Sequence, residues 1–286
     1  MTFRFYKMQG CGNDFLFLDS LKGETPHFSP SRIVYLCDRN FGLGADGLVV
    51  FEKSRVAHAK WKFYNSDGRE AEMCGNAARC AIRFLSEKHF PEEDSITLET
   101  RAGIIQGSKL ANGLVEISLF SKANLKFDYQ EKLLKRHDDT IRVFTINTGV
   151  PHTVTEVNDI HSYPIIDVGK FIRHHSLFQP QGTNVTFFQR LGGPKIRSTT
   201  FERGVERETL ACGTGAAAAS IVYSELYLQR FPIEVTVPGG VLVIDLNPTS
   251  ELLLLRGPAE YVFDLELDHL PKNFGKIRRF SEQGAQ

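Results

Sequence analysis

Hydrophobic positions fall into short runs along the chain, with two longer helical patterns placed among them. Alternating or β-branched runs at residues 16–18, 47–51, 61–64, 96–100 and 114–119 predict strands. Residues 75–88 place their apolar side chains, such as Ala78, Ala81 and Leu85, at the spacing of one helix face. Residues 213–228 are apolar nearly all round, which predicts a helix buried inside the protein.

The second half of the chain resembles the first at a constant offset. Cys212 lies 138 residues after Cys74, and Glu208 lies 138 residues after Glu70. The same offset aligns the strand-like residues 46–50 with 184–188, and after one residue of slippage 96–98 with 233–235. Only two copies fit the length, so we expect a duplication rather than a solenoid.

These patterns predict an α/β fold of two pseudo-symmetric halves, each a β-sheet layer wrapped around one central helix. We expect residues 1–122 to form the N-terminal half with Cys74, and 123–264 the C-terminal half with Cys212. Residues 265–286 are expected to return to the N-terminal half and to end in a mobile tail, which is polar and basic from Lys272 onward. The polar stretch 122–139 is the predicted crossing between the halves.

Composition excludes several classes of protein. The 286 residues carry 34 Lys and Arg against 34 Asp and Glu, so no net charge favours nucleic acid or an anionic membrane. No apolar run is long enough to span a bilayer, and the first residues lack the apolar stretch of a signal peptide. Five cysteines are too few and too scattered for a disulfide scaffold. We therefore expect a cytoplasmic protein with reduced thiols.

Cys74 and Cys212 each stand immediately before a glycine and the start of a predicted helix. Unpaired N–H groups at such a start carry partial positive charge, which predicts a lowered thiol pKa and a cradle for a carboxylate. Gly75 and Gly213 would let a ligand approach the backbone closely. If the halves face each other across a cleft, the two thiols flank one carbon, as a racemase or epimerase requires. One thiolate removes the α-hydrogen while the opposite thiol protonates the other face.

Eight segments carry a resemblance to a known family. They are residues 8–15 (MQGCGNDF), 65–68 (NSDG), 73–80 (MCGNAARC), 182–185 (GTNV), 202–204 (ERG), 208–215 (ETLACGTG), 237–240 (VPGG) and 257–259 (GPA). In this order they resemble diaminopimelate epimerase, which interconverts LL- and meso-diaminopimelate in lysine and peptidoglycan precursor biosynthesis. The resemblance implies two α/β halves with the active site in the cleft between them. It also implies a small-molecule substrate and no pyridoxal phosphate, other cofactor or metal.

The resemblance also implies a role for each matching residue. Cys74 and Cys212 resemble the two catalytic thiols, and His152 and Glu202 resemble polar partners that tune them. Residues that resemble the family's substrate-binding positions are Asn13, Asn65, Gly75, Asn76, Asn184, Glu202, Arg203, Gly213 and Thr214. Among these, the two helix-start pairs are expected to grip the reacting carboxylate. Arg203 can hold a carboxylate at the non-reacting end with two parallel hydrogen bonds.

Three positions depart from the family's usual pattern. Many members have Asn where this chain has Val150, and some have Gln where it has Gly47, so recognition of the distal end of the substrate is in doubt. Phe263 stands where some members have a Tyr at a dimer contact, so a homodimer is implied only by analogy.

Other functions remain open from the sequence. A proline racemase-like enzyme on the same fold is one alternative, although a small cyclic substrate has no use for Arg203 and three substrate-facing Asn residues. A redox-sensing protein whose Cys74 and Cys212 form a disulfide is another. Residues 42–47 satisfy G-x-G-x-x-G, but a strand-like run rather than a helix follows them, which favours a turn over a dinucleotide site. The cysteines and histidines show no zinc spacing.

Overall fold

The computed structural model describes residues 3–23, 26–121, 130–137, 139–247 and 249–267. The expected mobile tail at 268–286 lies outside these residues. The elements of the first repeat are β1 (Phe3–Gly10), β2 (Asn13–Asp19), α1 (Pro30–Cys37), β3 (Gly47–Glu52), β4 (Ala59–Asn65), β5 (Glu70–Ala71), α2 (Gly75–Lys88), β6 (Ile96–Thr100), β7 (Gly103–Lys109) and β8 (Val115–Ser121). Those that follow are β9 (Gln130–Arg136), β10 (Asp139–Asn147), β11 (Pro151–Glu156), α3 (Ile165–Arg173), the 3-10 turn η2 (Ser176–Phe178), β12 (Asn184–Arg190), β13 (Lys195–Glu202), β14 (Arg207–Glu208), α4 (Gly213–Tyr227), β15 (Ile233–Val237), β16 (Gly240–Leu246), β17 (Leu252–Gly257) and β18 (Glu260–Leu267).

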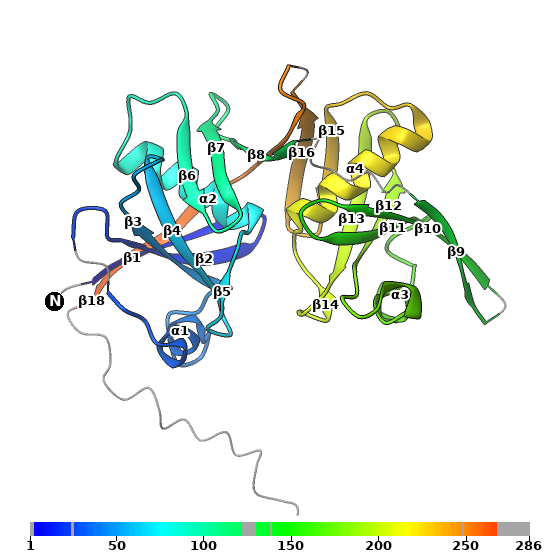
Figure 1. The fold of residues 1–286 in the computed structure, drawn as a ribbon, viewed down its shortest axis with the longest axis horizontal. Coiled ribbons are helices and arrows are strands. Elements are labelled where there is room, and N and C mark those ends of the chain that lie inside the picture. The colour runs from blue at the N-terminus through cyan, green and yellow to red at the C-terminus, as the bar shows by residue number, and fades with distance from the viewer. Residues whose placement is uncertain (1–2, 24–25, 122–129, 138, 248, 268–286) are drawn as a thin grey trace, which may run out of the picture.

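Strand pairing repeats itself in the two halves. The first half has the order β18–β1–β2–β3–β4–β6–β7–β8, and the second has β9–β10–β11–β12–β13–β15–β16–β17. The parallel pairs β2–β3 and β4–β6 correspond to the parallel pairs β11–β12 and β13–β15. Antiparallel pairing of β8 with β17 joins the two layers (Figure 1). This arrangement confirms the predicted α/β fold of two pseudo-symmetric halves.

One long helix lies inside each layer, as the sequence predicts. Helix α2 buries the side chains from Asn76 through Ile82, and α4 buries an almost continuous run from Gly215 to Tyr223. The interior of the first half is rich in aromatic side chains: Phe84 of α2 stacks on Phe51 with ring centroids 5.2 Å apart. Apolar side chains from both helices belong to one continuous core, so the two halves share an interior.

The structure differs from the sequence-based expectations at three places. The chain returns to the first half at Glu260, where β18 begins to pair with β1, and not at residue 265. The expected crossing at 122–139 includes the strand β9, which pairs with β10. Helices α1 and α3 were not predicted, although Ser29 caps α1 and Pro30 opens it, which is a recognisable start signal. Within the described ranges no helix is long and apolar enough to cross a membrane.

Candidate active site

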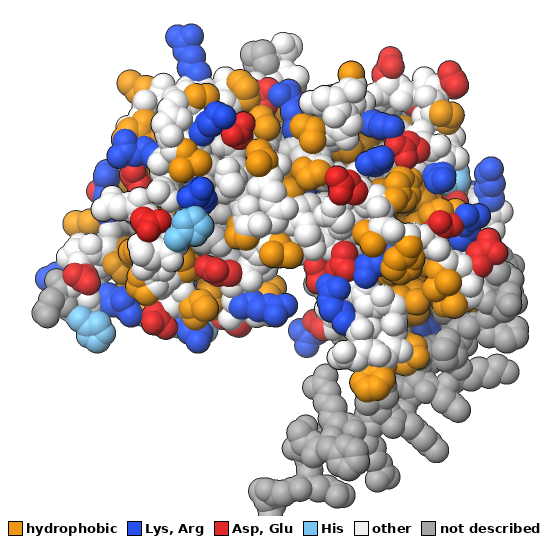
Figure 2. All heavy atoms as spheres, turned by 180° about the vertical axis from the view of Figure 1, so that it is seen from behind, with side chains coloured by type: hydrophobic (Ala, Val, Ile, Leu, Met, Phe, Trp, Pro, Cys, Tyr) orange, Lys and Arg blue, Asp and Glu red, His pale blue; other side chains and the backbone are white. Residues whose placement is uncertain are grey.

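The two repeated cysteines occupy equivalent positions. Cys74 is the N-cap of α2 and Cys212 the N-cap of α4; both have extended backbone, and both thiols are free and partly exposed. Each cysteine follows a two-residue strand, β5 or β14, and these strands flank the space between the halves in Figure 1. Seen from behind, the surface is notched between the halves at its lower edge (Figure 2).

The helix starts meet across the boundary between the halves. A β-carbon placed on Gly213 would lie 4.0 Å from the Cα of Gly75 and 2.9 Å from Cδ2 of Leu255, and the same methyl is 3.2 Å from a β-carbon placed on Gly75. Asn76 donates one hydrogen bond of 3.0 Å to the carbonyl of Ala211 and another of 3.0 Å to Oδ1 of Asn13. Side chains at either glycine would therefore separate the two helix starts.

Glu202, at the end of β13, interacts with both thiols. The Cys212 thiol donates a hydrogen bond to its carboxylate, and the same negative charge acts on Cys74. Thr209 donates a second hydrogen bond of 2.6 Å to Oε1. One carboxylate that is coupled to both sulfur atoms indicates that Cys74 and Cys212 belong to one site.

The expectation of lowered thiol pKa values is wrong for the substrate-free protein. The backbone N–H groups of Asn76 and Ala77 do act to lower the pKa of Cys74, but burial outweighs them and raises it above its usual value. Burial and the charge of Glu202 raise the pKa of Cys212 further. Both sulfurs are therefore protonated thiols at neutral pH until another positive charge enters the site.

His152 lies behind Cys212 and reaches it through a hydroxyl group. Oγ1 of Thr214 is 3.4 Å from the Cys212 sulfur and 3.0 Å from Nε2 of His152. Asn184 accepts the backbone N–H of Arg203 at Oδ1, which turns its NH₂ group toward Nε2 of His152. Nε2 is therefore an acceptor, and the proton resides on Nδ1, which is 3.0 Å from Oγ1 of Thr186.

His152 should make the protein sensitive to acid. Burial, helped by the charge of Arg203, lowers its pKa from 6.5 to about 3. The unfolded chain binds the extra proton first, so this contribution to stability is complete above pH 6.5 and declines as pH falls from 6.5 toward 3. We expect the urea midpoint of wild type to fall across this window. His152→Gln should reduce the slope by up to about 1.4 kcal/mol per pH unit.

A suitable control is His161→Gln, because His161 is exposed on a turn. The pH series is measured by urea denaturation on all three proteins. An unchanged slope in His152→Gln would show that the buried imidazole is not the group that titrates.

The remaining predicted substrate residues lie around this centre. Arg203 is partly exposed and donates from Nη1 to the carbonyl of Gln181 at 2.9 Å; within the described part of the chain no carboxylate is bonded to it. The amide of Asn13 already donates to Asp46 at 3.0 Å and accepts from Asn76. Asn65 is exposed at the end of β4. The structure thus gathers Asn13, Asn76, Asn184 and Arg203 into hydrogen-bond networks, whereas Asn65 stands at the rim.

Gly47 faces Asn65 in the β3–β4 register. A β-carbon at this position would lie 2.6 Å from the carbonyl oxygen of Tyr64 and 2.8 Å from the ring of Phe63. No side chain fits there without a backbone shift, so an amide from this position is not available. Val150 precedes β11 and contributes only its backbone carbonyl, which accepts the N–H of Thr148.

The sequence interpretation missed the residue beneath the first helix start. Arg79 is fully buried, and its Nη2 donates to Oδ1 of Asn76 at 2.9 Å. A signal was present, because Arg79 is a single charge among the apolar residues Ala77, Ala78 and Ala81 of a helix that was predicted to be buried.

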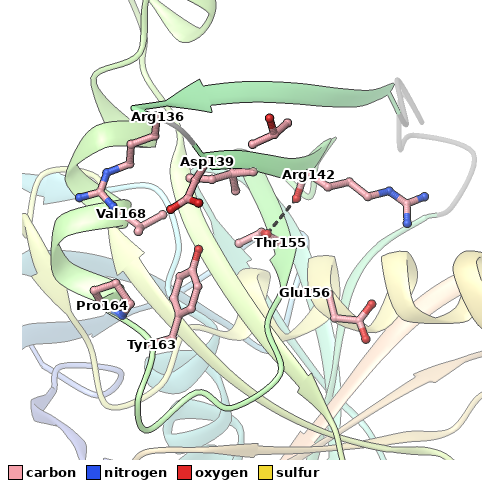
Figure 3. Close-up of a pocket in the computed structure, with 10 residues that line it drawn as sticks. Arg136, Asp139, Arg142, Thr155, Glu156, Tyr163, Pro164 and Val168 are labelled. Carbon is pink, nitrogen blue, oxygen red and sulfur yellow. Dashed lines mark hydrogen bonds between the residues drawn. The ribbon is translucent and has the colours of Figure 1, made fainter.

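The cavity of about 460 Å³ in Figure 3 does not include any predicted site residue. It lies between the β9–β10 hairpin and α3. The Asp139 carboxylate points toward the Tyr163 ring, while the side chain of Arg142 points away from both and pairs with Glu131. The thiol site is therefore identified by its chemistry and not by the size of a hollow.

Comparison with known proteins agrees with this geometry. The family model described as diaminopimelate epimerase matches residues 5–121 and 144–262, which are the two repeats. Curated relatives named diaminopimelate epimerase include one from Aquifex aeolicus, 39% identical over 272 residues that cover 91% of this chain and 96% of that protein. Another, from Acinetobacter baumannii (strain AYE), is 35% identical over 279 residues, covering 94% of this chain and 98% of its own.

Solved structures share the fold at low sequence identity. A hydroxyproline epimerase from Agrobacterium vitis, with bound trans-4-hydroxy-L-proline, has a TM-score of 0.67 and 13% identity, covering 93% of this chain and 92% of its own. A phenazine biosynthesis protein of the PhzF family from Bacillus anthracis has a TM-score of 0.64 and 16% identity, covering 93% and 99%. These structures support the architecture alone.

Proposed function

We propose, from the premise that this chain belongs to the diaminopimelate epimerase family, that it interconverts LL- and meso-2,6-diaminopimelate. The enzyme is a cofactor-independent amino-acid epimerase. The observation that carries the two-thiol mechanism is the pairing of Cys74 and Cys212 at two abutting helix starts, with Glu202 coupled to both. A reaction that inverts one carbon needs a proton acceptor on one face and a proton donor on the other.

Substrate binding changes the charge of the site. The α-ammonium group brings a positive charge close to Cys74 and Cys212, which offsets the negative charge of Glu202 and favours a thiolate. That thiolate takes the α-proton, and the electron pair of the broken C–H bond spreads into the adjacent carboxylate. The opposite thiol then donates its proton to the other face of the carbon. One S–H bond forms and one breaks, so the enzyme ends with its proton on the opposite sulfur.

The helix starts stabilise the charge that builds up during this step. N–H groups at Gly75 and Asn76, and at Gly213 and Thr214, can donate to the reacting carboxylate as it gains electron density. Glycine at both first helical positions leaves the backbone open to the ligand. His152 stays neutral and holds Thr214, which in turn contacts the Cys212 sulfur.

The distal end of the substrate requires its own partners. Arg203 can bind the second carboxylate with two hydrogen bonds, and the amides of Asn65 and Asn184 can take the second ammonium or carboxylate. Gly47 and Val150 supply no side-chain amide, so recognition at this end depends more on Arg203. A small cyclic substrate such as proline has no second carboxylate for this residue to bind.

A homodimer in the cytoplasm completes the proposal. Strand β18 carries the exposed apolar side chains Val262 and Phe263, which are 53% and 40% exposed. Figure 2 shows hydrophobic side chains gathered among charges on the half to which β18 belongs. A second copy that packs on this strand would remove them from water.

Solvent isotope incorporation tests the proposed reaction. Reduced, purified protein is incubated with LL-diaminopimelate in deuterated water without added cofactor, and the isomers are separated and weighed by mass spectrometry. We expect the meso isomer to appear with one α-deuterium, because the incoming proton comes from a thiol that exchanges with solvent. L-Proline serves as the comparison substrate, and racemisation of proline without any reaction of diaminopimelate would overturn the proposal.

A further inference from the structure

Arg79 is a fully buried charge without a carboxylate partner within the described residues. Its relative exposure is 0%, and its hydrogen bonds all go to neutral acceptors. A guanidinium stays protonated in proteins, so a full positive charge is held inside the core. Taking such a charge out of water is costly unless it is well paired, which makes an unpaired buried arginine a candidate for a functional role.

The side chain connects the first helix start to three surrounding segments. Nη2 donates to Oδ1 of Asn76 at 2.9 Å and lies 3.8 Å from the sulfur of Cys11. Nη1 is 3.4 Å from the carbonyl of Gly75, and Nε donates to the carbonyl of Pro258 at 3.3 Å. Pro258 lies in the link between β17 and β18, where the chain returns to the first half.

The hydrogen bond to Asn76 fixes which way that amide points. Because Arg79 donates to Oδ1, the NH₂ group of Asn76 must face Asn13 and the carbonyl of Ala211. Ala211 immediately precedes Cys212. Arg79 therefore supports the contact by which the two cysteine-bearing helix starts are held together.

The two halves are not equivalent at this position. The repeat offset of 138 residues places Ala217, which is fully buried, where the first half has Arg79. The second helix start instead has the neutral His152 and the carboxylate of Glu202 beside its thiol. A positive charge thus lies behind one cysteine of the pair and not behind the other.

We infer that Arg79 is a positioning residue of the epimerase reaction: its buried guanidinium stabilises the thiolate form of Cys74 and, through Asn76, holds the two helix starts together. This inference rests on the proposed two-thiol function. The charges that act on the Cys74 sulfur are Arg79 on its own helix and Glu202 on β13. Around Arg79 the titratable groups are the thiols of Cys11 and Cys80 as well as Cys74, and Glu260 on β18 acts on Cys11.

Alkylation of the thiols tests this inference without any substrate. Iodoacetamide reacts with thiolates, so its rate on Cys74 and Cys212, resolved by peptide mass and measured against pH, reports the acidity of each sulfur. We expect Arg79→Gln to slow alkylation of Cys74 roughly tenfold near neutral pH, as a one-unit rise in its pKa implies. Cys212 should change by less than about twofold, since Ala217 stands in place of Arg79 in its half.

Two further variants separate charge from structure. Arg79→Lys keeps the charge but cannot bind Asn76 and Pro258 together, so it should retain most of the Cys74 alkylation rate while epimerisation falls. Arg83→Gln removes an arginine one turn later on α2 that bonds the carbonyl of Ala259 and pairs with Glu87, and neither thiol should change.

Three outcomes would overturn the inference. One is unchanged Cys74 alkylation in Arg79→Gln. Another is an equal change at both cysteines, which would indicate general loosening of the fold. The third is the same loss in Arg79→Lys as in Arg79→Gln. If diaminopimelate proves not to be the substrate, the alkylation series still gives its own answer, so the failure of one proposal can be distinguished from the failure of the other.

Discussion

Replacing Cys74 by alanine is expected to abolish inversion at the α-carbon while the protein stays folded. The thiol is the proton carrier for one face of the substrate, and loss of a positioned general acid or base lowers turnover by about 10²–10⁴-fold. Cys212→Ala should have an equal effect, because the reaction needs both faces. Epimerisation is measured in each direction, and circular dichroism confirms that the fold is retained.

Isotope exchange gives this prediction a sharper form. The thiol that remains can still remove and return a proton on its own face, so each variant should exchange the α-hydrogen of one isomer with deuterated water and leave the other untouched. The two variants should choose opposite isomers. Cys37→Ala is the matched control, since Cys37 is buried outside the site and its variant should keep turnover. Full turnover in either active-site variant would refute the assignment of two bases.

Arg203→Ala should weaken binding of the substrate by roughly a hundredfold. Two charge-assisted hydrogen bonds to the distal carboxylate contribute about 3 kcal/mol, and each 1.4 kcal/mol changes an equilibrium tenfold. The backbone N–H of residue 203 still bonds Asn184, so the local structure should persist. The effect should appear mainly in KM, measured by epimerisation at increasing substrate concentration.

A shortened substrate without the distal carboxylate provides the internal control. Wild type should prefer the full-length diamino acid strongly, whereas Arg203→Ala should treat both compounds nearly alike. Arg207→Ala, in the exposed strand β14, should behave like wild type. Loss of kcat with unchanged KM in Arg203→Ala would place this arginine elsewhere in the mechanism.

Much of the fold could be predicted from the sequence because the duplication supplies two readings of each element. Residues 75–88 and 213–228 were expected to be helices, and α2 and α4 begin at the expected residues, Gly75 and Gly213. The strand-like run at 47–51 is β3, and its repeat at 184–188 lies in β12. The peripheral helices α1 and α3 were missed because they lie outside the segments that the offset test aligned.

The electrostatics of the site could not be predicted from the sequence. Spacing places Cys74 and Cys212 at helix starts, where N–H dipoles lower a thiol pKa, and that part of the reasoning holds. Burial depends on the three-dimensional packing of both halves, and it outweighs the dipoles. The link from His152 to the second thiol is also invisible in the sequence, because Thr214 lies 62 residues from His152 and bridges the two groups.

The exchange of edge strands affects how the two repeats can diverge. β18 follows the second repeat along the chain but completes the sheet of the first, and β8 pairs with β17 across the boundary. Neither repeat is therefore a module that could be lost, shuffled or fused to another gene with its sheet intact. Natural selection must consequently retain both copies together, even as each accumulates different substitutions around its own cysteine.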